Sequence, residues 1–526
     1  MRKRDVSSFI VILLLIISAL TVAIIINNTV DSDNVYFNAK MFDVDNGDTK
    51  INWDKYSTSY IDLSQLSGPL SISESGVYHL TGTLNNQAVI VNGVNKKVKL
   101  ILDNVEINNQ NGPAIACLEG DDLVIELIGL NTLEDGETYS LDYDEDVNGV
   151  IYSKADLTLL GEGYLYITAN YADGIVSKDD LKVANGYYRI TAKDDGIRGK
   201  DSVYILAGDY RIESGADAIK STNEDTSGKG FVLIEDGNYS ITATGKGMKA
   251  VNGILIKGGD FLIDSKDDAI HSNDYAEILG GRISINSGDD GLHADKRLII
   301  GDGEINVLKS YEGMEAQAVT INGGHISINA SDDGINAGGG TDGSANNRPG
   351  MGQFDVNTDC ILTINDGTIR ISASGDGLDS NGYLYINGGS LIVDGPTNDG
   401  NGALDAGGGI IMSGGEVIAA GSSGMAETLG SNSLVNNISV YFDSQQATGT
   451  KVEIKNSADE TVMEYVSKKS FNHLAAGSSN FEYGESYTIY INGDYYNSFT
   501  ISSVTTTIGN MNNVRGGDPR RNPSSF

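Results

Sequence analysis

The chain has 526 residues, of which 66 are glycine and only 6 are proline. This composition excludes collagen, and a hydrophobic fraction of 40% is too high for a disordered linker. Acidic residues outnumber basic ones 72 to 36, and the resulting net charge of −36 makes nucleic acid an unfavourable partner. The excess of acidic residues favours the binding of divalent cations, because carboxylate oxygens are the ligands that Ca²⁺ prefers.

The N-terminus reads as an export segment. Basic residues at positions 2–4 precede an apolar or weakly polar run from Phe9 to Ile26, which is just long enough to cross a bilayer. The basic flank is expected to stay in the cytoplasm, so the remainder of the chain is expected to be extracellular, either anchored at the cell surface or secreted. A retained membrane anchor is favoured over a cleaved signal peptide, because the apolar run continues past the small residues at 21–23.

Two cysteines, Cys117 and Cys360, lie far apart in the sequence beside apolar residues of expected strands. Two buried free thiols are therefore expected in place of a disulfide. An exported protein with so few cysteines must draw its stability from extensive burial.

A unit with the pattern hydrophobic-x-x-Gly-x-hydrophobic-x-hydrophobic recurs along most of the chain. Clear copies are Val183–Ile190, Ile205–Ile212, Ile256–Ile263 and Ile321–Ile328, and the aligned glycines are mostly 22 residues apart. The alternation inside each unit is typical of a strand. A unit of short strands cannot bury its apolar side alone, so the copies are expected to stack and to pair in parallel.

The expected fold is therefore all-β, a right-handed parallel β-helix of eleven coils with about 22 residues per coil. The expected organisation is a signal anchor or signal peptide at 1–30, a linker and β-cap at 31–88, the β-helix at 89–430, a C-terminal β subdomain at 431–509 and a disordered tail at 510–526.

An acidic corner follows each glycine unit, as in Asp-Asp-Gly-Ile at 194–197 and Asp-Asp-Ala-Ile at 267–270. Carboxylates stacked about 4.8 Å apart repel one another unless cations, bases or protons offset their charge. Paired acids could bind Ca²⁺, or each Asp could be a turn residue whose side chain accepts backbone N–H groups two residues on, and both interpretations stay open. The candidate metal ligands are Asp173, Asp194, Asp195, Asp217, Asp267, Asp268, Asp289, Asp290, Asp332 and Asp333.

Aromatic residues fall into two sets. Tyr188, Tyr210, Tyr239 and Phe261 align with core isoleucines and are expected to form an internal stack, whereas Tyr164, Tyr166 and Tyr187 are expected at the surface.

Several segments resemble a known family. Val147–Leu157 (VNGVIYSKADL), Gly174–Leu181 (GIVSKDDL), Asp194–Ser202 (DDGIRGKDS) and Gly395–Asp405 (GPTNDGNGALD) are similar to segments of secreted clostridial β-helix proteins that bind carbohydrate. The resemblance implies a topology like that of pectate lyases, an association with calcium, and cellulose or acidic plant polysaccharides as ligands. Lys246 departs from the pattern, because it stands where most other coils carry the Asp of the acidic corner. It would therefore interrupt a column of metal ions bound by these corners.

A variable position after each acidic corner is expected to point outward, and its column contains Val176, Arg198, Lys220, Lys249, His271, His293, Glu315, Asn336, Asp379 and Asp405. Its bases either balance the acidic corners or form a strip that recognises uronate carboxylates. Arg189 and Arg211, which lie one coil apart on another strand, form a second candidate strip. The candidate carbohydrate contacts are Arg189, Arg198, Arg211, Lys220, Lys249, His271 and His293, with the two histidines expected to stack in solvent as surface residues or as metal ligands.

Three functions compete, in this order: a polysaccharide-binding protein without catalysis, a Ca²⁺-dependent polyuronate lyase, and a structural stalk or adhesin. A lyase would need Ca²⁺ and a base such as Arg198 or Lys220, but a motif repeated on every coil singles out no catalytic residue. The expected partners are a polysaccharide and, through an uncleaved N-terminal segment, the membrane. Calcium bridging between a protein carboxylate and a uronate is the favoured mode of binding.

Overall fold

The computed structural model describes residues 51–140, 143–144, 146–225, 228–339 and 356–510. The predicted export segment, the tail from residue 511 and most of the insertion around 337–357 lie outside these residues. Compactness divides the chain into units Met1–Asp45 and Asn46–Phe526, and everything described below belongs to the second. None of the helices in the described ranges is long and apolar enough to cross a membrane.

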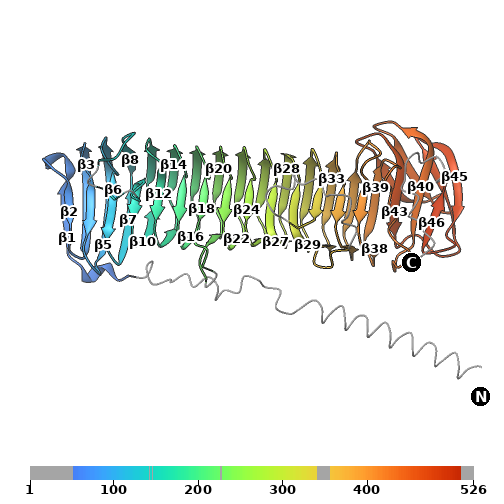
Figure 1. Ribbon diagram of the computed structural model, residues 1–526, viewed down its shortest axis with the longest axis horizontal. Coiled ribbons are helices and arrows are strands. Elements are labelled where there is room, and N and C mark those ends of the chain that lie inside the picture. The colour runs from blue at the N-terminus through green and yellow to red at the C-terminus, as the bar shows by residue number, and fades with distance from the viewer. Residues whose placement is uncertain (1–50, 141–142, 145, 226–227, 340–355, 511–526) are drawn as a thin grey trace, which may run out of the picture. The chain divides into compact units, whose positions relative to one another are not determined.

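The described chain is all-β, with about 1% helix, and forms a parallel β-solenoid of about 15 turns (Figure 1). Ile175 pairs with Ile197, and Ile197 pairs with Ile219, so one coil takes 22 residues and the predicted period is confirmed. The right-handed sense of the helix stays a prediction.

The first coils begin before the expected start of the helix at Val89. They contain the 3-10 turns η2 (Trp53–Lys55) and η3 (Leu63–Gln65) and strands β1 (Thr58–Asp62), β2 (Leu70–Ile72), β3 (Gly76–Asn85), β4 (Val89–Asn92), β5 (Lys97–Asn109), β6 (Ile115–Glu119) and β7 (Asp122–Ile128). Parallel pairing already joins β1 to β3 and β3 to β5. These coils lack the repeated glycine unit and contain the longest strands of the solenoid. Because the expected eleven coils were counted from that glycine unit, the expected number was too low.

Each later coil contributes one strand to each of three faces, which we call the corner, middle and long-strand faces. The corner face holds β9 (Gly149–Ser153), β12 (Asp173–Ser177), β15 (Ile197–Gly199), β18 (Ile219–Ser221), β21 (Met248–Ala250), β24 (Ile270–Ser272), β31 (Ile335–Ala337), β34 (Leu378–Ser380) and β37 (Leu404–Ala406). The middle face holds β10 (Asp156–Gly161), β13 (Asp180–Val183), β16 (Ser202–Ile205), β19 (Phe231–Ile234), β22 (Gly253–Ile256), β25 (Tyr275–Ile278), β32 (Ile361–Ile364), β35 (Tyr383–Ile386) and β38 (Gly409–Met412). Strands β27 (Leu292–Ile300) and β29 (Met314–Ile321) run through both faces.

The long-strand face holds β8 (Leu130–Asp135), β11 (Tyr164–Ala169), β14 (Tyr187–Ala192), β17 (Asp209–Ser214), β20 (Asn238–Ala243), β23 (Asp260–Ser265), β26 (Arg282–Asn286), β28 (Glu304–Ser310), β30 (His325–Ala330), β33 (Thr368–Ala373), β36 (Ser390–Asp394) and β39 (Glu416–Gly421). Burial alternates strictly along β14, so every second side chain faces solvent. The glycine of the repeat precedes these strands at a turn with positive φ, for example +127° at Gly186. Residues that carry a side chain rarely adopt such a φ.

The core contains the predicted aromatic stack. Tyr188, Tyr210, Tyr239 and Phe261 lie on successive coils with ring centroids 5.0, 4.9 and 4.4 Å apart and planes within 5° of parallel. All four are at most 4% exposed, and both cysteines are buried free thiols as predicted.

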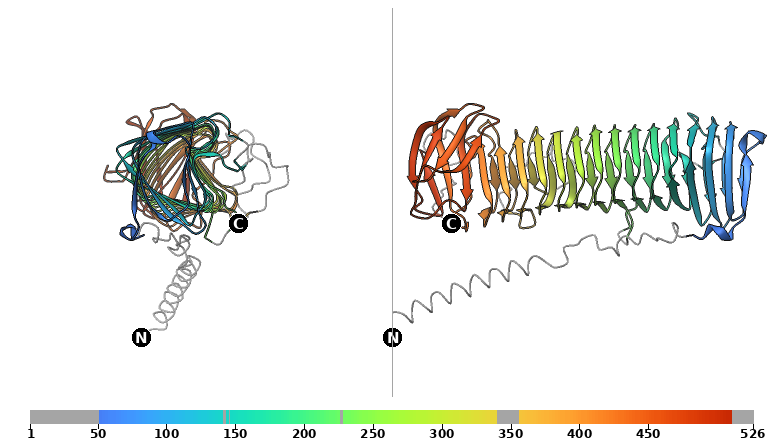
Figure 2. Two further views of the ribbon diagram at one scale, coloured as in Figure 1. Left: turned by 90° about the vertical axis from the view of Figure 1, so that its left-hand side faces the viewer. Right: turned by 180° about the vertical axis from the view of Figure 1, so that it is seen from behind.

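Antiparallel strands follow the last coil (Figure 2). Strand β43 (Phe471–Ser478) pairs antiparallel with β39 and with β40 (Asn437–Gln446), and β46 (Thr505–Ile508) pairs in parallel with β40. A separate sheet contains β41 (Lys451–Lys455), β42 (Thr461–Val466), β44 (Ser486–Ile491) and β45 (Asp494–Thr500). Pairing of β43 with β39 covers the strand edge that the solenoid would otherwise expose.

Candidate functional site

The inner carboxylates of the corner face form a hydrogen-bonded ladder from coil to coil. Oδ1 of Asp173 accepts the backbone N–H of Asp195 at 3.1 Å, and Oδ1 of Asp195 accepts that of Asp217 at 3.1 Å. Farther along, Oδ1 of Asp268 accepts the N–H of Asp290 at 2.9 Å. These carboxylates therefore act as backbone acceptors, but each accepts the N–H of the next coil, 22 residues on, and not an N–H two residues on as the turn interpretation predicted.

Basic side chains neutralise the same carboxylates through their second oxygens. Arg198 lies 2.5 Å from Asp173, and Lys220 lies 3.2 Å from Asp195 and 2.9 Å from Asp217. Only 19% of the Arg198 side chain and 24% of the Lys220 side chain are exposed. The charge-balance interpretation is thus confirmed for these two bases, and neither side chain is free to meet a ligand.

Lys246 and Lys249, on the next coil, differ in whether they form ion pairs. Lys246, which replaces a carboxylate, lies 2.6 Å from Asp268 and 3.0 Å from Asp267. Lys249 aligns with Lys220 and is half-buried, and no ion pair joins it to any of the described residues.

His271 and His293 stack as predicted, with ring centroids 4.6 Å apart, but their predicted exposure to solvent is wrong. They are 2% and 0% exposed, because each ring is held at both nitrogens by neighbouring side chains. Nδ1 of His271 bonds Asp268 at 2.8 Å, and Nδ1 of His293 bonds Asp290 at 3.0 Å. These histidines are not surface residues.

The charge of His293 follows from its surroundings. Burial alone would lower the pKa of the imidazole, but hydrogen bonds to Asp290, Asp295 and Glu315 raise it to about 12. The ring is therefore a cation at neutral pH, and it neutralises the carboxylates as a lysine would.

Val176 and Glu315 were also expected to face solvent and are buried, at 0% and 3% exposure. Val176 packs in a small apolar cluster with Val147 and Tyr152, which cover it. Glu315 lies against His293, 3.1 Å from its Nδ1.

Several of the predicted metal ligands lie close enough together to share an ion. Side-chain ligand atoms lie within 4.8 Å of one another in the groups Asp173, Asp194, Asp195 and Asp267, Asp268, Asp289 and Asp268, His271, His293. In each group, however, at least one buried carboxylate is already paired with Arg198, Lys220, Lys246 or His271. Calcium at these positions stays a prediction.

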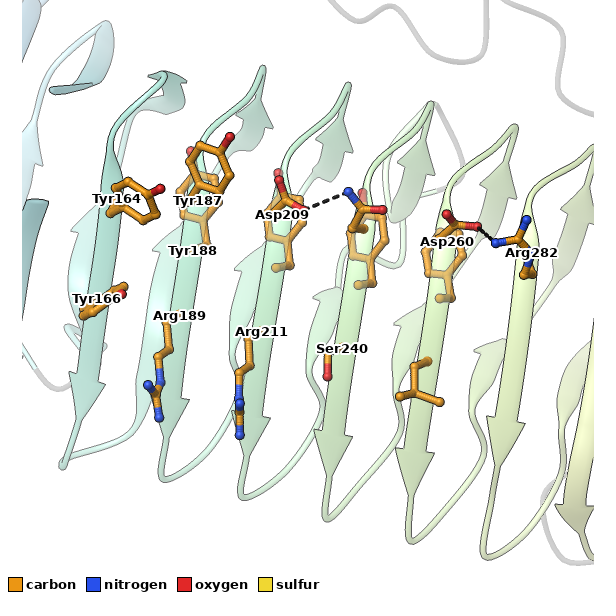
Figure 3. Close-up of a pocket in the computed structure, with 15 residues that line it drawn as sticks. Tyr164, Tyr166, Tyr187, Tyr188, Arg189, Asp209, Arg211, Ser240, Asp260 and Arg282 are labelled. Carbon is orange, nitrogen blue, oxygen red and sulfur yellow. Dashed lines mark hydrogen bonds and ion pairs between the residues drawn. The ribbon is translucent and has the colours of Figure 1, made fainter. Parts of the chain in front are cut away.

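A groove of about 520 Å³ crosses the long-strand face from β11 to β26 (Figure 3). Strand register places its outward residues in two rows that cross the coils. The upper row contains Tyr164, Tyr187, Asp209, Asn238, Asp260 and Arg282, and the lower row contains Tyr166, Arg189, Arg211, Ser240 and Leu262.

Tyrosines line the β11 end of this groove. Tyr164, Tyr166 and Tyr187 are 45%, 39% and 42% exposed, which confirms their predicted place at the surface. The rings of Tyr164 and Tyr187 lie 4.7 Å apart with planes 20° from parallel. They form a continuous aromatic platform across two coils.

Arginines of the groove differ in their partners. Arg211 bonds Glu213 at 3.0 Å, and Arg282 lies 3.1 Å from Asp260 and 3.5 Å from Glu304. Arg189, next to Tyr166 in the lower row, is exposed and forms no ion pair with any residue in the described ranges. The Arg189 guanidinium therefore lies beside exposed tyrosines without a carboxylate partner among the described residues.

Comparison with known proteins identifies the family. A family profile described as "Carbohydrate-binding domain-containing protein" matches residues 67–334, about half of the chain. The chain belongs to this family. A carbohydrate-binding domain-containing protein of Acetivibrio thermocellus is 33% identical over 145 residues, which are 26% of this chain and 51% of the relative. The chain thus spans about half the length of this curated relative.

One solved structure is more weakly similar to this chain. It is titled as a gadolinium derivative of the polysaccharide lyase-like protein from C. thermocellum, is 28% identical, and covers 47% of this chain and 99% of its own. Its TM-score of 0.39 is too low for a comparison of site geometry.

In this carbohydrate-binding family member, the groove lies wholly inside the region that the profile matches. Sequence reasoning proposed Arg189 and Arg211 but missed the contribution of the tyrosines and of Asn238, Asp260 and Arg282 to the same surface. The signal was present in the repeat spacing of 23 and then 22 residues, because aligning Tyr164 with Tyr187 and Arg189 with Arg211 would have placed all four residues in two adjacent rows.

Proposed function

We propose that this protein binds acidic polysaccharide chains in the groove of the long-strand face. The observation that carries the proposal is the unpaired, exposed Arg189 beside the platform of Tyr164 and Tyr187. Membership of the carbohydrate-binding family supports a polysaccharide ligand.

The two kinds of side chain suit the two parts of a uronate residue. An aromatic ring offers a flat apolar surface for the C–H face of a sugar ring, at little cost in side-chain entropy. A guanidinium offers a planar pair of N–H donors that matches a carboxylate. Because the rows repeat from coil to coil, a linear chain can make successive contacts along them.

Direct pairing replaces calcium bridging as the proposed main contact. The bases on the corner face are engaged by their own carboxylates, whereas Arg189 is not. A local positive group is needed here, since the net charge of −36 repels an anionic chain at long range. We further propose that the ligand is a plant cell-wall glycan of the pectin type and that the protein acts outside the cell.

The test compares single variants of the full-length protein. Arg189→Ala and Tyr187→Ala should each weaken binding to soluble polygalacturonate about tenfold, because each removes a central exposed contact. Affinity is measured at low salt in the presence of a chelator, so that bridging by a metal cannot contribute.

Lys257→Ala is the matched control, because Lys257 is also partly exposed but is already paired with Glu235 at 2.8 Å. It should bind like the wild type. Binding to insoluble cellulose should fall with Tyr187→Ala but not with Arg189→Ala, because cellulose carries no carboxylate. Wild-type affinity of both groove variants for polygalacturonate would refute the groove as the site, and failure of the wild type to bind any polysaccharide would refute the function.

A further inference from the structure

The outward side chains of the groove change in charge along the solenoid. On β11 and β14 they are the three exposed tyrosines and Arg189, so this part is aromatic and basic. From β17 to β26 the upper row continues with Asp209, Asn238, Asp260 and Arg282. We call the part on β11 and β14 the basic end of the groove and the part from β17 to β26 its acidic end.

The bases of the acidic end are already paired with carboxylates of the protein. Arg211 lies 3.0 Å from Glu213, and Arg282 lies 3.1 Å from Asp260 and 3.5 Å from Glu304. A guanidinium that holds a carboxylate has its charge offset before any ligand binds. The acidic end therefore offers a ligand carboxylate less attraction than the basic end does.

Asp209 has no base beside it. Its Oδ1 accepts a hydrogen bond from Nδ2 of Asn238 at 2.8 Å, and it forms no ion pair with any residue that the structure describes (Figure 3). The side chain is half-buried and follows Tyr187 in the upper row. A free uronate bound over Asp209 would meet a like charge, whereas a sugar hydroxyl could donate a hydrogen bond to its carboxylate.

A second hollow, of about 580 Å³, lies between the upper row and the glycine turns that precede the strands. It is lined by the upper row from Asp209 to Arg282, by glycines of the turns, by Ala207 and by the carboxylates of Asp236 and Glu304. Because glycine has no side chain, these turns leave room for a substituent of a sugar bound in the groove. The surrounding carboxylates disfavour a substituent that carries negative charge.

We propose that the groove selects acidic glycans whose charge is interrupted, with a free uronate at Arg189 and uncharged sugar residues over the acidic end. This inference rests on the proposed function and narrows its ligand. Coils are about 4.8 Å apart, which is close to the length of one pyranose residue, so neighbouring sugars of a chain along the rows lie over neighbouring coils. The uncharged residues are methyl-esterified uronates or neutral sugars, which share hydroxyl donors and lack a carboxylate.

Calorimetric titration of the full-length protein compares glycans of equal length at low salt, with a chelator present. The ligands are galacturonan with every carboxyl group free, partly methyl-esterified galacturonan, and a chain in which uronate alternates with a neutral sugar. The partly esterified chain should bind about tenfold more tightly than the free-acid chain, because fewer of its carboxylates meet the acidic end. An equal gain for the alternating chain assigns the selection to the missing charge, and a gain for the ester alone assigns it to esterified uronate.

Asp209→Asn tests the role of the acidic end, because it removes the charge and keeps the shape of the side chain. The next coil already carries Asn238 at the aligned position, so the variant should fold. Its affinity for the free-acid chain should rise about fivefold or more, and its affinity for the partly esterified chain should change by less than about twofold.

Asp264→Asn is the matched control. Asp264 is exposed on β23 and lines neither hollow, so this variant changes the net charge equally without altering the groove. Its affinity for the free-acid chain should rise by less than about twofold. If no glycan binds the wild type, the proposed function itself fails. If glycans bind but the free-acid chain binds at least as tightly as the partly esterified one, or Asp209→Asn behaves like Asp264→Asn, the function stands and this inference is wrong.

Discussion

His473 is a buried histidine whose environment is the opposite of that around His293. It is 2% exposed, its Nε2 shares a hydrogen bond of 2.8 Å with Oγ of Ser439, and the centroid of its ring lies 4.7 Å from that of Tyr441. Burial lowers the pKa of His473 to about 3, whereas three carboxylates raise that of His293. At the scale of one residue, neighbouring charges decide whether a buried imidazole is neutral or cationic.

The neutral state of His473 makes stability depend on pH. The unfolded chain binds a proton at this imidazole near pH 6.5 and the folded chain only near pH 3, so its contribution is present above pH 6.5 and is lost as the pH falls. Between pH 7 and pH 5, the wild type should lose about 2 kcal/mol of unfolding free energy relative to His473→Gln. Urea unfolding of both proteins at the two pH values checks this, and equal losses would contradict it.

At the scale of a single strand, the period of the repeat determines which side chains of neighbouring coils stack on one another. Because one coil takes 22 residues, the sequence alone was enough to align Tyr188 with Tyr210 and to predict their stacking. The same alignment placed His271 above His293 but could not show that both are buried. Burial depends on which neighbouring side chains reach the rings, and the pattern of one strand does not contain that information.

The aromatic stack supplies a prediction at this scale. Tyr210→Ala should lower the unfolding free energy by about 3–5 kcal/mol, because it opens a cavity between two stacked rings. Tyr210→Phe should cost only about 1 kcal/mol, since it removes just the hydrogen bond from the hydroxyl to the carbonyl of Ala207. Phe261 already occupies the equivalent place on another coil. Denaturant unfolding compares the variants, and similar losses for both would contradict a packing role.

Across the whole described unit, charge is organised along the axis of the solenoid. Arg198, Lys220 and His293 balance the carboxylates of the earlier coils of the corner face, and the following coils carry Glu312, Asp333 and Asp376 in the same ladder. The sequence predicted the columns themselves, because acids recur at a fixed spacing. It could not predict which carboxylates find a base, since Arg198 reaches back to Asp173 on the preceding coil and that reach depends on side-chain conformation.

The groove is likewise a property of several coils together. No single unit of the repeat contains the whole tyrosine platform, because Tyr164 comes from β11, whereas Tyr187 and Arg189 come from β14. Binding of an acidic glycan at this surface is the central claim about the molecule.

Hydroxyl-radical footprinting of tyrosine side chains, with and without polygalacturonate oligosaccharides, tests that claim most directly. Oxidation of Tyr164, Tyr166 and Tyr187 should fall several-fold when the glycan binds. Oxidation of Tyr60, Tyr483 and Tyr495, which are 78%, 74% and 65% exposed but lie outside the groove, should not change. Unchanged oxidation of the three groove tyrosines under saturating glycan, or protection of the other three instead, would contradict the account.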